Sequence, residues 1–334
     1  MSRTDDLVDD ETQAKEIGLS EVPIIDLAPF LGGTPSDRAR VAAQIAQACR
    51  EIGFFYVVGH GVPEQLRSDV FACAEAFYHK DDAEKMSTLA TPDWYRGWIP
   101  AQPGTALSRA SRLFEQFRMQ ADLPPDDPDV RAGSPLYQPN RWPADMPGFA
   151  ETCNRYYDAM VALSRHLLRA FALGLGLPED RFEGMFNKPL SQLSLQYYPP
   201  LPEAAEKDVS NTRSHTDEGP LTILAQGRVS GLEVKRRDGT WIAAPPVEGA
   251  YTINVGDMLM WWSNGRYLSN LHRVRNRAGV ERFSVPFFMN PDFETVVEPL
   301  PELLEAGDAP IHEPVRVGEH LLRFYASFKT QPAA

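Results

Sequence analysis

The feature that most constrains the fold is a series of short β-rich segments in the second half of the chain. Turn signals such as Asp238-Gly239 and Asn264-Gly265 separate these segments. Short strands at this spacing are typical of a closed or double-sheet β architecture, and the jelly roll is the natural candidate. The eight predicted strands span residues 193–198, 221–225, 232–235, 240–243, 251–255, 258–262, 272–275 and 282–288.

The first half of the chain shows a different pattern, in which two strands alternate with two helices. A strand is predicted over 22–27 and a buried strand over 54–58. Between them, Thr34 before Pro35 is typical of a helix start, and Gly53 ends that helix. A second helix begins near Pro63, so the order is βαβα.

Three further segments complete the fold prediction. An amphipathic helix is predicted over 149–175 and a last helix over 317–328, because apolar residues recur there on one helical face. Residues 94–142 are rich in Pro, Gly and aromatic residues, and we expect loops and short strands that line a site. The fold class is mainly β with α, a jelly-roll core flanked by helices.

No internal repeat or clear boundary divides the chain, so we predict one domain over residues 21–334. Its N-terminal mixed part covers 21–190, the jelly-roll core 191–300 and a C-terminal helical segment 301–334. Residues 1–20 carry acidic residues and lack the apolar segment of a secretory signal. We expect them to form a flexible acidic tail.

Composition excludes several functional classes. The formal net charge is -13 and no dense Lys/Arg run occurs, so nucleic acid is a poor partner. Apolar stretches fall short of the roughly 20 residues that a membrane helix needs. The three cysteines lie in apolar helical patterns, as expected of buried thiols in a reducing cytoplasm. We therefore expect a cytoplasmic protein.

A candidate metal site is formed by His215, Asp217 and His272. Residues i and i+2 of a strand point to one face, so His215 and Asp217 can approach one ion from a strand end. His272 begins a later predicted strand. Two imidazoles and one carboxylate suit non-haem Fe(II) when the other coordination positions stay open, whereas a fourth protein ligand would indicate structural zinc.

A candidate anion site follows ten residues after His272. Arg282 and Ser284 alternate onto one face of a predicted strand. A guanidinium binds a carboxylate with two hydrogen bonds, and a hydroxyl adds a third. The pair can therefore hold a small dicarboxylate.

Several motifs closely resemble the isopenicillin N synthase-like branch of the 2-oxoglutarate- and Fe(II)-dependent oxygenases. The resemblance covers most of the chain from Val22 to about Phe328. Its motifs are Gly53-Phe54-Phe55-Tyr56-Val57-Val58, His60-Gly61-Val62, Tyr197-Tyr198-Pro199-Pro200, His215-Thr216-Asp217, Leu221-Thr222-Ile223-Leu224, Ser263-Asn264-Gly265, His272-Arg273-Val274 and Arg282-x-Ser284.

The resemblance implies a double-stranded β-helix that carries iron on His215, Asp217 and His272. It implies 2-oxoglutarate and O2 as cosubstrates, with succinate and CO2 released as a C–H bond is oxidised. Arg282 and Ser284 would bind the far carboxylate of 2-oxoglutarate, and Tyr198 would add a phenol hydrogen bond. Hydroxylation is the default outcome, with desaturation or ring closure as variants.

The substrate of such an enzyme is a small molecule, and its contacts are expected before the long helix. In relatives, a turn similar to Arg96-Gly97-Trp98 lies over the iron, and we hypothesise that Arg96 pairs with an anionic group on the substrate. Many relatives carry a basic residue where this chain has Ser194, so substrate orientation is not transferred from them. The candidate substrate contacts are Tyr95, Arg96, Trp98, Phe114, Phe117 and Ser194.

Three further expectations remain. Trp261 and Trp262 should alternate faces of a strand, so that at most one enters the barrel. The chain should be a monomer or a weak homo-oligomer. Two other functions stay open: a 2-oxoglutarate-independent oxidase of the isopenicillin N synthase or ethylene-forming type, and a non-catalytic metal-binding sensor.

Overall fold

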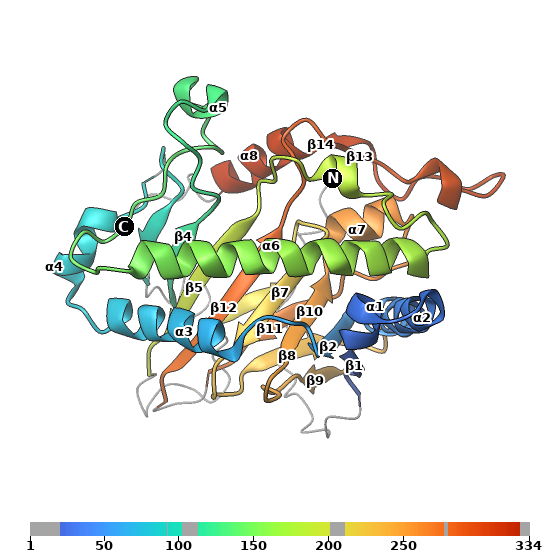
Figure 1. Ribbon diagram of the computed structural model, residues 1–334, viewed down its shortest axis with the longest axis horizontal. Coiled ribbons are helices and arrows are strands. Elements are labelled where there is room, and N and C mark those ends of the chain that lie inside the picture. The colour runs from blue at the N-terminus through green and yellow to red at the C-terminus, as the bar shows by residue number, and fades with distance from the viewer. Residues whose placement is uncertain (1–20, 92, 102–112, 201–210, 277–279, 328–334) are drawn as a thin grey trace.

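A large eight-stranded β-sheet, a small four-stranded sheet, a two-stranded sheet and a layer of helices make up the described part of the fold in the computed structural model (Figure 1). The structure describes residues 21–91, 93–101, 113–200, 211–276 and 280–327. The predicted acidic tail over 1–20 lies outside the described residues.

The helices are α1 Ala28–Gly32, α2 Pro35–Glu51, α3 Glu64–Tyr78, α4 Asp82–Lys85, α5 Pro128–Arg131, α6 Phe149–Gly174, α7 Asp257–Trp262 and α8 Val317–Ser327. The strands are β1 Ile24–Asp26, β2 Phe54–Val58, β3 Gly97–Ile99, β4 Glu115–Met119, β5 Gln192–Tyr198, β6 Thr212–His215, β7 Leu221–Gln226, β8 Leu232–Lys235, β9 Trp241–Ala243, β10 Tyr251–Val255, β11 His272–Val274, β12 Arg282–Met289, β13 Val296–Val297 and β14 Val315–Arg316.

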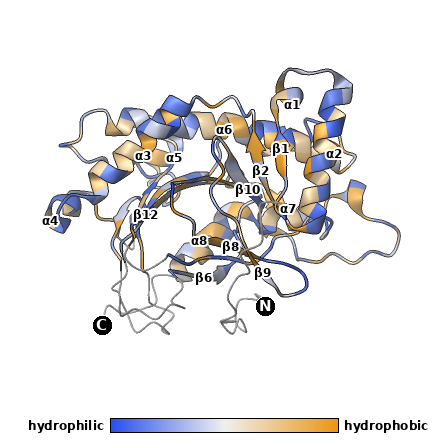
Figure 2. Ribbon diagram, turned by 90° about the horizontal axis from the view of Figure 1, so that it is seen from below, coloured by the Kyte–Doolittle hydropathy of each residue, from blue (hydrophilic) through white to orange (hydrophobic). Residues whose placement is uncertain are grey.

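The large sheet has the strand order β1-β2-β10-β7-β12-β5-β4-β3, and the small sheet has the order β6-β11-β8-β9. Helices α3 and α6 lie on one side of the large sheet, and β6, β8 and β9 lie on the other (Figure 2). Apolar residues of β2 pack against those of β8 and β9, which joins the two sheets face to face. The predicted double-sheet jelly-roll architecture is confirmed.

Local chemistry explains the helices of the outer layer. Thr34 caps α2, and its hydroxyl and the Asp37 carboxylate form a reciprocal capping box ahead of Pro35. Gly53 follows with a φ of 70°, and a Cβ there would lie 2.1 Å from the Leu268 carbonyl oxygen. Only glycine fits this turn, which leads the chain directly into β2.

The faces of the large sheet differ sharply in chemistry. Toward the helices, alternate strand residues are apolar and pack against α2, α3 and α6 in one continuous core. Toward the small sheet, the alternate residues are largely polar, although most are buried. Buried polar residues need partners, so this inner face is where a ligand is expected. They include Gln116, Gln192, Ser194, Thr222, Gln226, Thr252, Asn254, Arg282 and Ser284.

Most predicted elements are confirmed, including the βαβα opening, the long helix and the last helix. The predicted strand over 258–262 is wrong, because Asp257–Trp262 forms the short helix α7. Trp261 and Trp262 therefore do not alternate faces of a strand, and both are buried. Strand β6, which carries His215, was not among the predicted strands.

Among the described residues, no helix combines the length and apolar character needed to cross a membrane.

Candidate active site

The three predicted metal ligands converge between the two sheets. His215 ends β6 and pairs directly with His272 at the start of β11. Their rings lie 4.3 Å apart between centroids. The His215 and His272 Nε2 atoms lie 3.8 and 3.7 Å from Oδ1 of Asp217. One ion can therefore contact all three side chains.

Asp217 reaches the site in a different way from the one predicted. Strand β6 ends at His215, so Asp217 lies two residues beyond the strand, in the segment that follows. Its Oδ2 accepts hydrogen bonds from the Thr222 hydroxyl at 2.5 Å and the Asn254 amide at 2.8 Å. These bonds leave Oδ1 directed at the histidines. The carboxylate is thus oriented before any ion binds.

Backbone carbonyls select the histidine tautomers. Nδ1 of His215 lies 2.8 Å from the carbonyl oxygen of Arg213, and Nδ1 of His272 lies 3.3 Å from that of Asn270. A neutral imidazole that donates from Nδ1 presents the lone pair of Nε2, which is the atom that faces Asp217 here. Both rings therefore offer metal-binding nitrogens toward the same point.

The charge state also suits a dication. Burial, together with His215 nearby, lowers the pKa of His272 to about 4, so its imidazole is neutral at neutral pH. Burial opposes ionisation of Asp217, but the imidazoles and the bonds from Thr222 and Asn254 keep its pKa below the ordinary value. A buried carboxylate and the neutral His272 imidazole, together with the His215 ring, make up the donor set that Fe(II) accepts.

The predicted anion site lies deeper between the sheets. Arg282 is 1% exposed, and its Nε and Nη2 atoms have no hydrogen-bond partner among the described residues. Its guanidinium lies 4.7 Å from the Tyr198 ring centroid, and Nη1 is 3.4 Å from the Ser284 hydroxyl. Burial lowers the pKa of Arg282, yet an arginine stays charged at neutral pH. A buried unpaired cation is costly, so the site fits a bound carboxylate.

Strand pairing brings the residues of the anion site together. Arg282 pairs with Tyr198, and Ser284 pairs with Gln196. Gln196 accepts hydrogen bonds from the Tyr198 and Ser284 hydroxyls at 2.8 and 3.2 Å. Phe114 stacks on the Tyr198 ring at 5.1 Å and closes one side.

Two predicted substrate contacts face the wrong side of the sheet. Phe117 is fully buried and packs on Phe77 and Phe149 of the helix layer. Trp98 pairs with Phe117 across β3 and β4, and its indole donates to Glu115. The prediction that Trp98 and Phe117 contact substrate is therefore wrong, because strand alternation turns both away from the metal.

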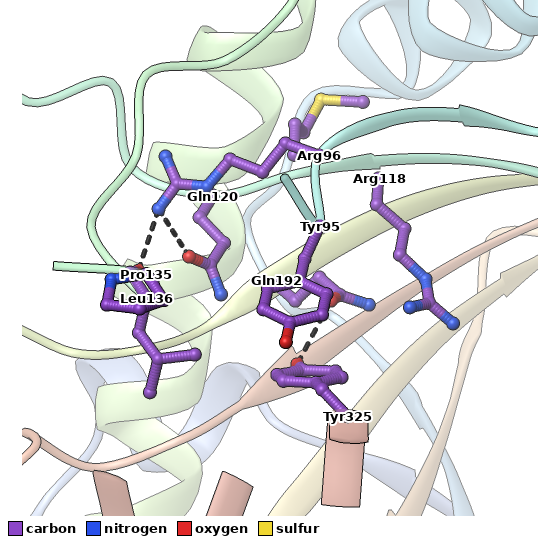
Figure 3. Close-up of a pocket in the computed structure, with 9 residues that line it drawn as sticks. Tyr95, Arg96, Arg118, Gln120, Pro135, Leu136, Gln192 and Tyr325 are labelled. Carbon is purple, nitrogen blue, oxygen red and sulfur yellow. Dashed lines mark hydrogen bonds between the residues drawn. The ribbon is translucent and has the colours of Figure 1, made fainter. Parts of the chain in front are cut away.

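Two of the other predicted contacts, Tyr95 and Arg96, line a small pocket beside the C-terminal helix (Figure 3). Arg96 donates from Nη2 to the Gln120 side chain and the Leu136 carbonyl oxygen, which directs its guanidinium into the pocket wall. Tyr95 stacks on Tyr325 of α8 at 5.0 Å. Ser194 is 1% exposed on the inner face of β5, and its hydroxyl has no partner among the described residues.

Several residues of the site have no role in the sequence prediction. Thr222 and Asn254 hold Asp217, and Gln196 links Tyr198 to Ser284. Their signal in the sequence is a polar residue within an otherwise apolar strand, as in Tyr-Thr-Ile-Asn-Val at 251–255. That signal marks an inward position without saying which partner it meets.

Comparisons with known proteins agree with this geometry. Residues 22–145 match the family described as non-haem dioxygenase in morphine synthesis N-terminal, and residues 189–291 match the 2OG-Fe(II) oxygenase superfamily. A 2-oxoglutarate-Fe(II) type oxidoreductase of Emericella nidulans is 32% identical, covering 88% of this chain and 86% of that protein.

Two further relatives have more specific names. A homoarginine-6-hydroxylase of Oryza sativa subsp. japonica is 34% identical over 90% of this chain and 95% of its own. Isopenicillin N synthase of Streptomyces griseus is 31% identical over 90% of this chain and 94% of its own.

A solved structure gives the same result for the fold. A full-length protein of Neurospora crassa, in complex with alpha-KG and thymine, superposes with a TM-score of 0.82 at 26% identity, covering 92% of this chain and 96% of that one. The chain therefore belongs to the 2-oxoglutarate- and Fe(II)-dependent oxygenase superfamily, an oxidoreductase family whose cofactors are Fe(II) and 2-oxoglutarate.

Proposed function

We propose that His215, Asp217 and His272 hold the iron, and that Arg282, Ser284 and Tyr198 bind the far carboxylate of 2-oxoglutarate. The bound pair supplies O2-dependent oxidation of a C–H bond, with release of succinate and CO2. The reaction on this chain is hydroxylation of a small molecule, and desaturation or ring closure are variants of it. Secondary metabolism is the physiological setting that the fungal relatives suggest.

The protein's own residues contribute orientation and exclusion of water. Thr222 and Asn254 fix the Asp217 carboxylate, and the backbone carbonyls fix the imidazoles. His215 remains the accessible ligand, with 46% of its side chain exposed against 10% for His272. The open side of the metal site is therefore on the His215 side, where a substrate can approach while the opposite side stays dry.

The observation that carries the proposal is the buried guanidinium of Arg282, with two nitrogens lacking described partners. In a 2-oxoglutarate-independent oxidase, a carboxylate of the substrate itself would have to neutralise this charge. The relationship to isopenicillin N synthase keeps that alternative as the second candidate. A non-catalytic sensor would bind metal but show no O2 uptake with any substrate.

Binding of 2-oxoglutarate to the Fe(II)-loaded protein under anaerobic conditions tests the assignment. Arg282→Gln removes a charge-assisted contact, which is worth about 1.5–3 kcal/mol, so the Kd should rise roughly 10- to 100-fold. The Kd of Arg282→Lys should lie between those of the wild type and Arg282→Gln, because lysine keeps the charge but lacks the bidentate geometry. The control is Arg155→Gln, which removes one exposed charge on α6.

An unchanged Kd in Arg282→Gln would contradict the assignment. Calorimetry measures the Kd directly, and metal affinity of the same variants shows whether the iron site is intact. If the wild-type protein consumes O2 with a substrate but forms no succinate, the oxidase alternative is correct.

Other parts of the proposal concern the substrate region and the cell. Tyr95, Arg96, Phe114 and Ser194 remain predicted substrate contacts, and a structure with bound substrate tests each of them. We propose one oxygenase domain over 21–334, acting in the cytoplasm as a monomer or weak homo-oligomer. Sedimentation and cell fractionation test these two points.

A further inference from the structure

Arg118 is a second inward-facing cation on the inner face of the large sheet. It lies on β4 two residues after Gln116, so the two side chains share a face. Gln116 pairs with Gln196, which contacts Tyr198 and Ser284. The Arg118 side chain is therefore on the side of the metal and anion sites, not on the side of the helices.

The strand register places Arg118 between these two sites. It pairs with Ser194, and Ser194 lies between Gln192 and Gln196 on β5. Gln192 pairs with Phe288, which also pairs with Thr222, the residue that holds Asp217. Gln196 pairs with Ser284 of the anion site. Arg118 and Ser194 therefore lie on the inner face of the sheet between the residues that orient the metal ligand Asp217 and the residues of the anion site.

No described carboxylate forms an ion pair with Arg118. Its Nε donates to Gln116 at 2.8 Å, which leaves the two terminal nitrogens for another partner. Burial lowers its pKa, and Tyr325 partly offsets that effect. Glu115, three residues earlier on β4, faces the other side and pairs with Lys85. The guanidinium is a charge that the fold itself does not neutralise.

The hydroxyl of Ser194, the residue paired with Arg118, provides an independent observation. It is buried and has no hydrogen-bond partner among the described residues, although a buried hydroxyl without a partner is costly. A guanidinium opposite a free hydroxyl is the same pair of groups that Arg282 and Ser284 present. The inner face therefore carries two such pairs.

The surroundings of Arg118 are partly aromatic. Tyr95, Tyr325 and Gln192 lie between it and Arg96, and the guanidinium of Arg96 is directed away toward Gln120 and Leu136 (Figure 3). Tyr325 donates to Gln192 and stacks on Tyr95, so α8 closes this side. Nη2 of Arg96 is fixed by Gln120 and Leu136 and its buried Nη1 has no described partner, whereas both terminal nitrogens of Arg118 remain for a ligand.

We propose that Arg118 and the Ser194 hydroxyl bind the carboxylate of the substrate, so that this enzyme selects small organic acids with an aromatic or apolar body. This inference rests on the proposed function, because it places the acid group beside the proposed iron and 2-oxoglutarate sites. In this arrangement, Arg118 and Ser194 on the inner face of the large sheet hold the substrate carboxylate, and the rest of the substrate extends toward the metal site.

Matched acid and amide probes test the proposal. Binding of phenylacetate, cinnamate and pentanoate, each against its carboxamide, is measured by calorimetry on protein loaded with Mn(II) and 2-oxoglutarate. The wild-type protein should bind at least one acid about tenfold more tightly than its amide, as expected for a charge-assisted contact. Arg118→Gln should reduce that preference to less than twofold, and Arg118→Lys should retain part of it.

The controls separate binding from folding and from the cosubstrate. Arg155→Gln makes the same charge change on the exposed face of α6 and should keep the full preference. Ser194→Ala should weaken acid binding by a smaller factor. Thermal unfolding of each variant identifies any folding defect, and Arg118→Lys keeps the test valid if Arg118→Gln unfolds.

Three results would overturn the proposal: a wild-type protein that prefers no acid of the panel, an unchanged preference in Arg118→Gln, or a tenfold weaker 2-oxoglutarate affinity in that variant. The last would mean that Arg118 serves the cosubstrate. If the wild-type protein fails to bind 2-oxoglutarate at all, the proposed function fails instead. The acid preference, measured without metal and cosubstrate, then still tests Arg118 separately.

Discussion

At the scale of single residues, the metal site depends on groups that never touch the ion. Asp217 is the one ligand outside a strand, and two hydrogen bonds fix the orientation of its carboxylate. Without these two bonds the carboxylate could rotate, and its Oδ1 would no longer be held toward the two histidines. Thr222 and Asn254 are therefore positioning residues.

Thr222→Val tests that role at nearly constant volume. Loss of a hydrogen bond to a ligating carboxylate typically costs 10- to 100-fold in metal affinity or activity, and we expect a fall in Fe(II) affinity within that range. The control is Thr252→Val on β10, whose hydroxyl contacts Gln226 rather than a metal ligand. Equal metal affinity in Thr222→Val and wild type, measured by competition with a chelator, would refute the role.

At the scale of elements, the pattern of the sequence predicts most strands and helices but not every residue's partner. Residues 258–262 form an apolar run that fits a strand or a buried helix equally well, and Asp257 after Gly256 begins a helix there. Strand β6 is short and polar, so alternation does not reveal it. The sequence does not predict that Trp98 and Phe117 face the helices, because the face of a strand depends on its register, which the sequence alone does not give.

The metal triad could be predicted because it needs only three side chains, and two histidines with one aspartate in this order form a distinctive ligand set. The partners of Asp217 could not, since Thr222 and Asn254 meet it only through the pairing of β7 with β10. Arg118 is a similar case. Its charge is visible in the sequence, but its inward position depends on the pairing of β4 with β5.

Helix α2 offers a prediction at this scale. Thr34→Ala removes the hydroxyl that accepts a hydrogen bond from the Asp37 amide, and the expected loss of stability is about 1 kcal/mol. Ser36→Ala, an exposed change two residues later, should alter stability by less than about 0.5 kcal/mol. Urea denaturation of both variants provides the comparison, and equal midpoints would show that the capping box contributes nothing.

At the scale of the whole molecule, the architecture divides stability from chemistry. One apolar core runs between the helices and the outer face of the large sheet, from Ile25 to Tyr325. The inner face carries the polar residues that the core cannot tolerate, and the small sheet encloses them. The inner face can therefore hold an unpaired charge such as that of Arg282. The free-energy cost of burying this charge is offset by apolar burial in the core and by pairing with the bound anion.

Iron-dependent conversion of 2-oxoglutarate to succinate in the presence of a substrate is the decisive measurement for the proposed chemistry. A screen across amino acids, nucleobases, terpenoids and aromatic acids supplies that substrate, with succinate measured for wild type and Asp217→Ala. We predict that wild type releases succinate only when Fe(II) is present and that Asp217→Ala loses at least about 99% of the rate, because one of three ligands is gone. Full succinate release by Asp217→Ala, or release that persists after iron is chelated, would contradict the assignment of this site.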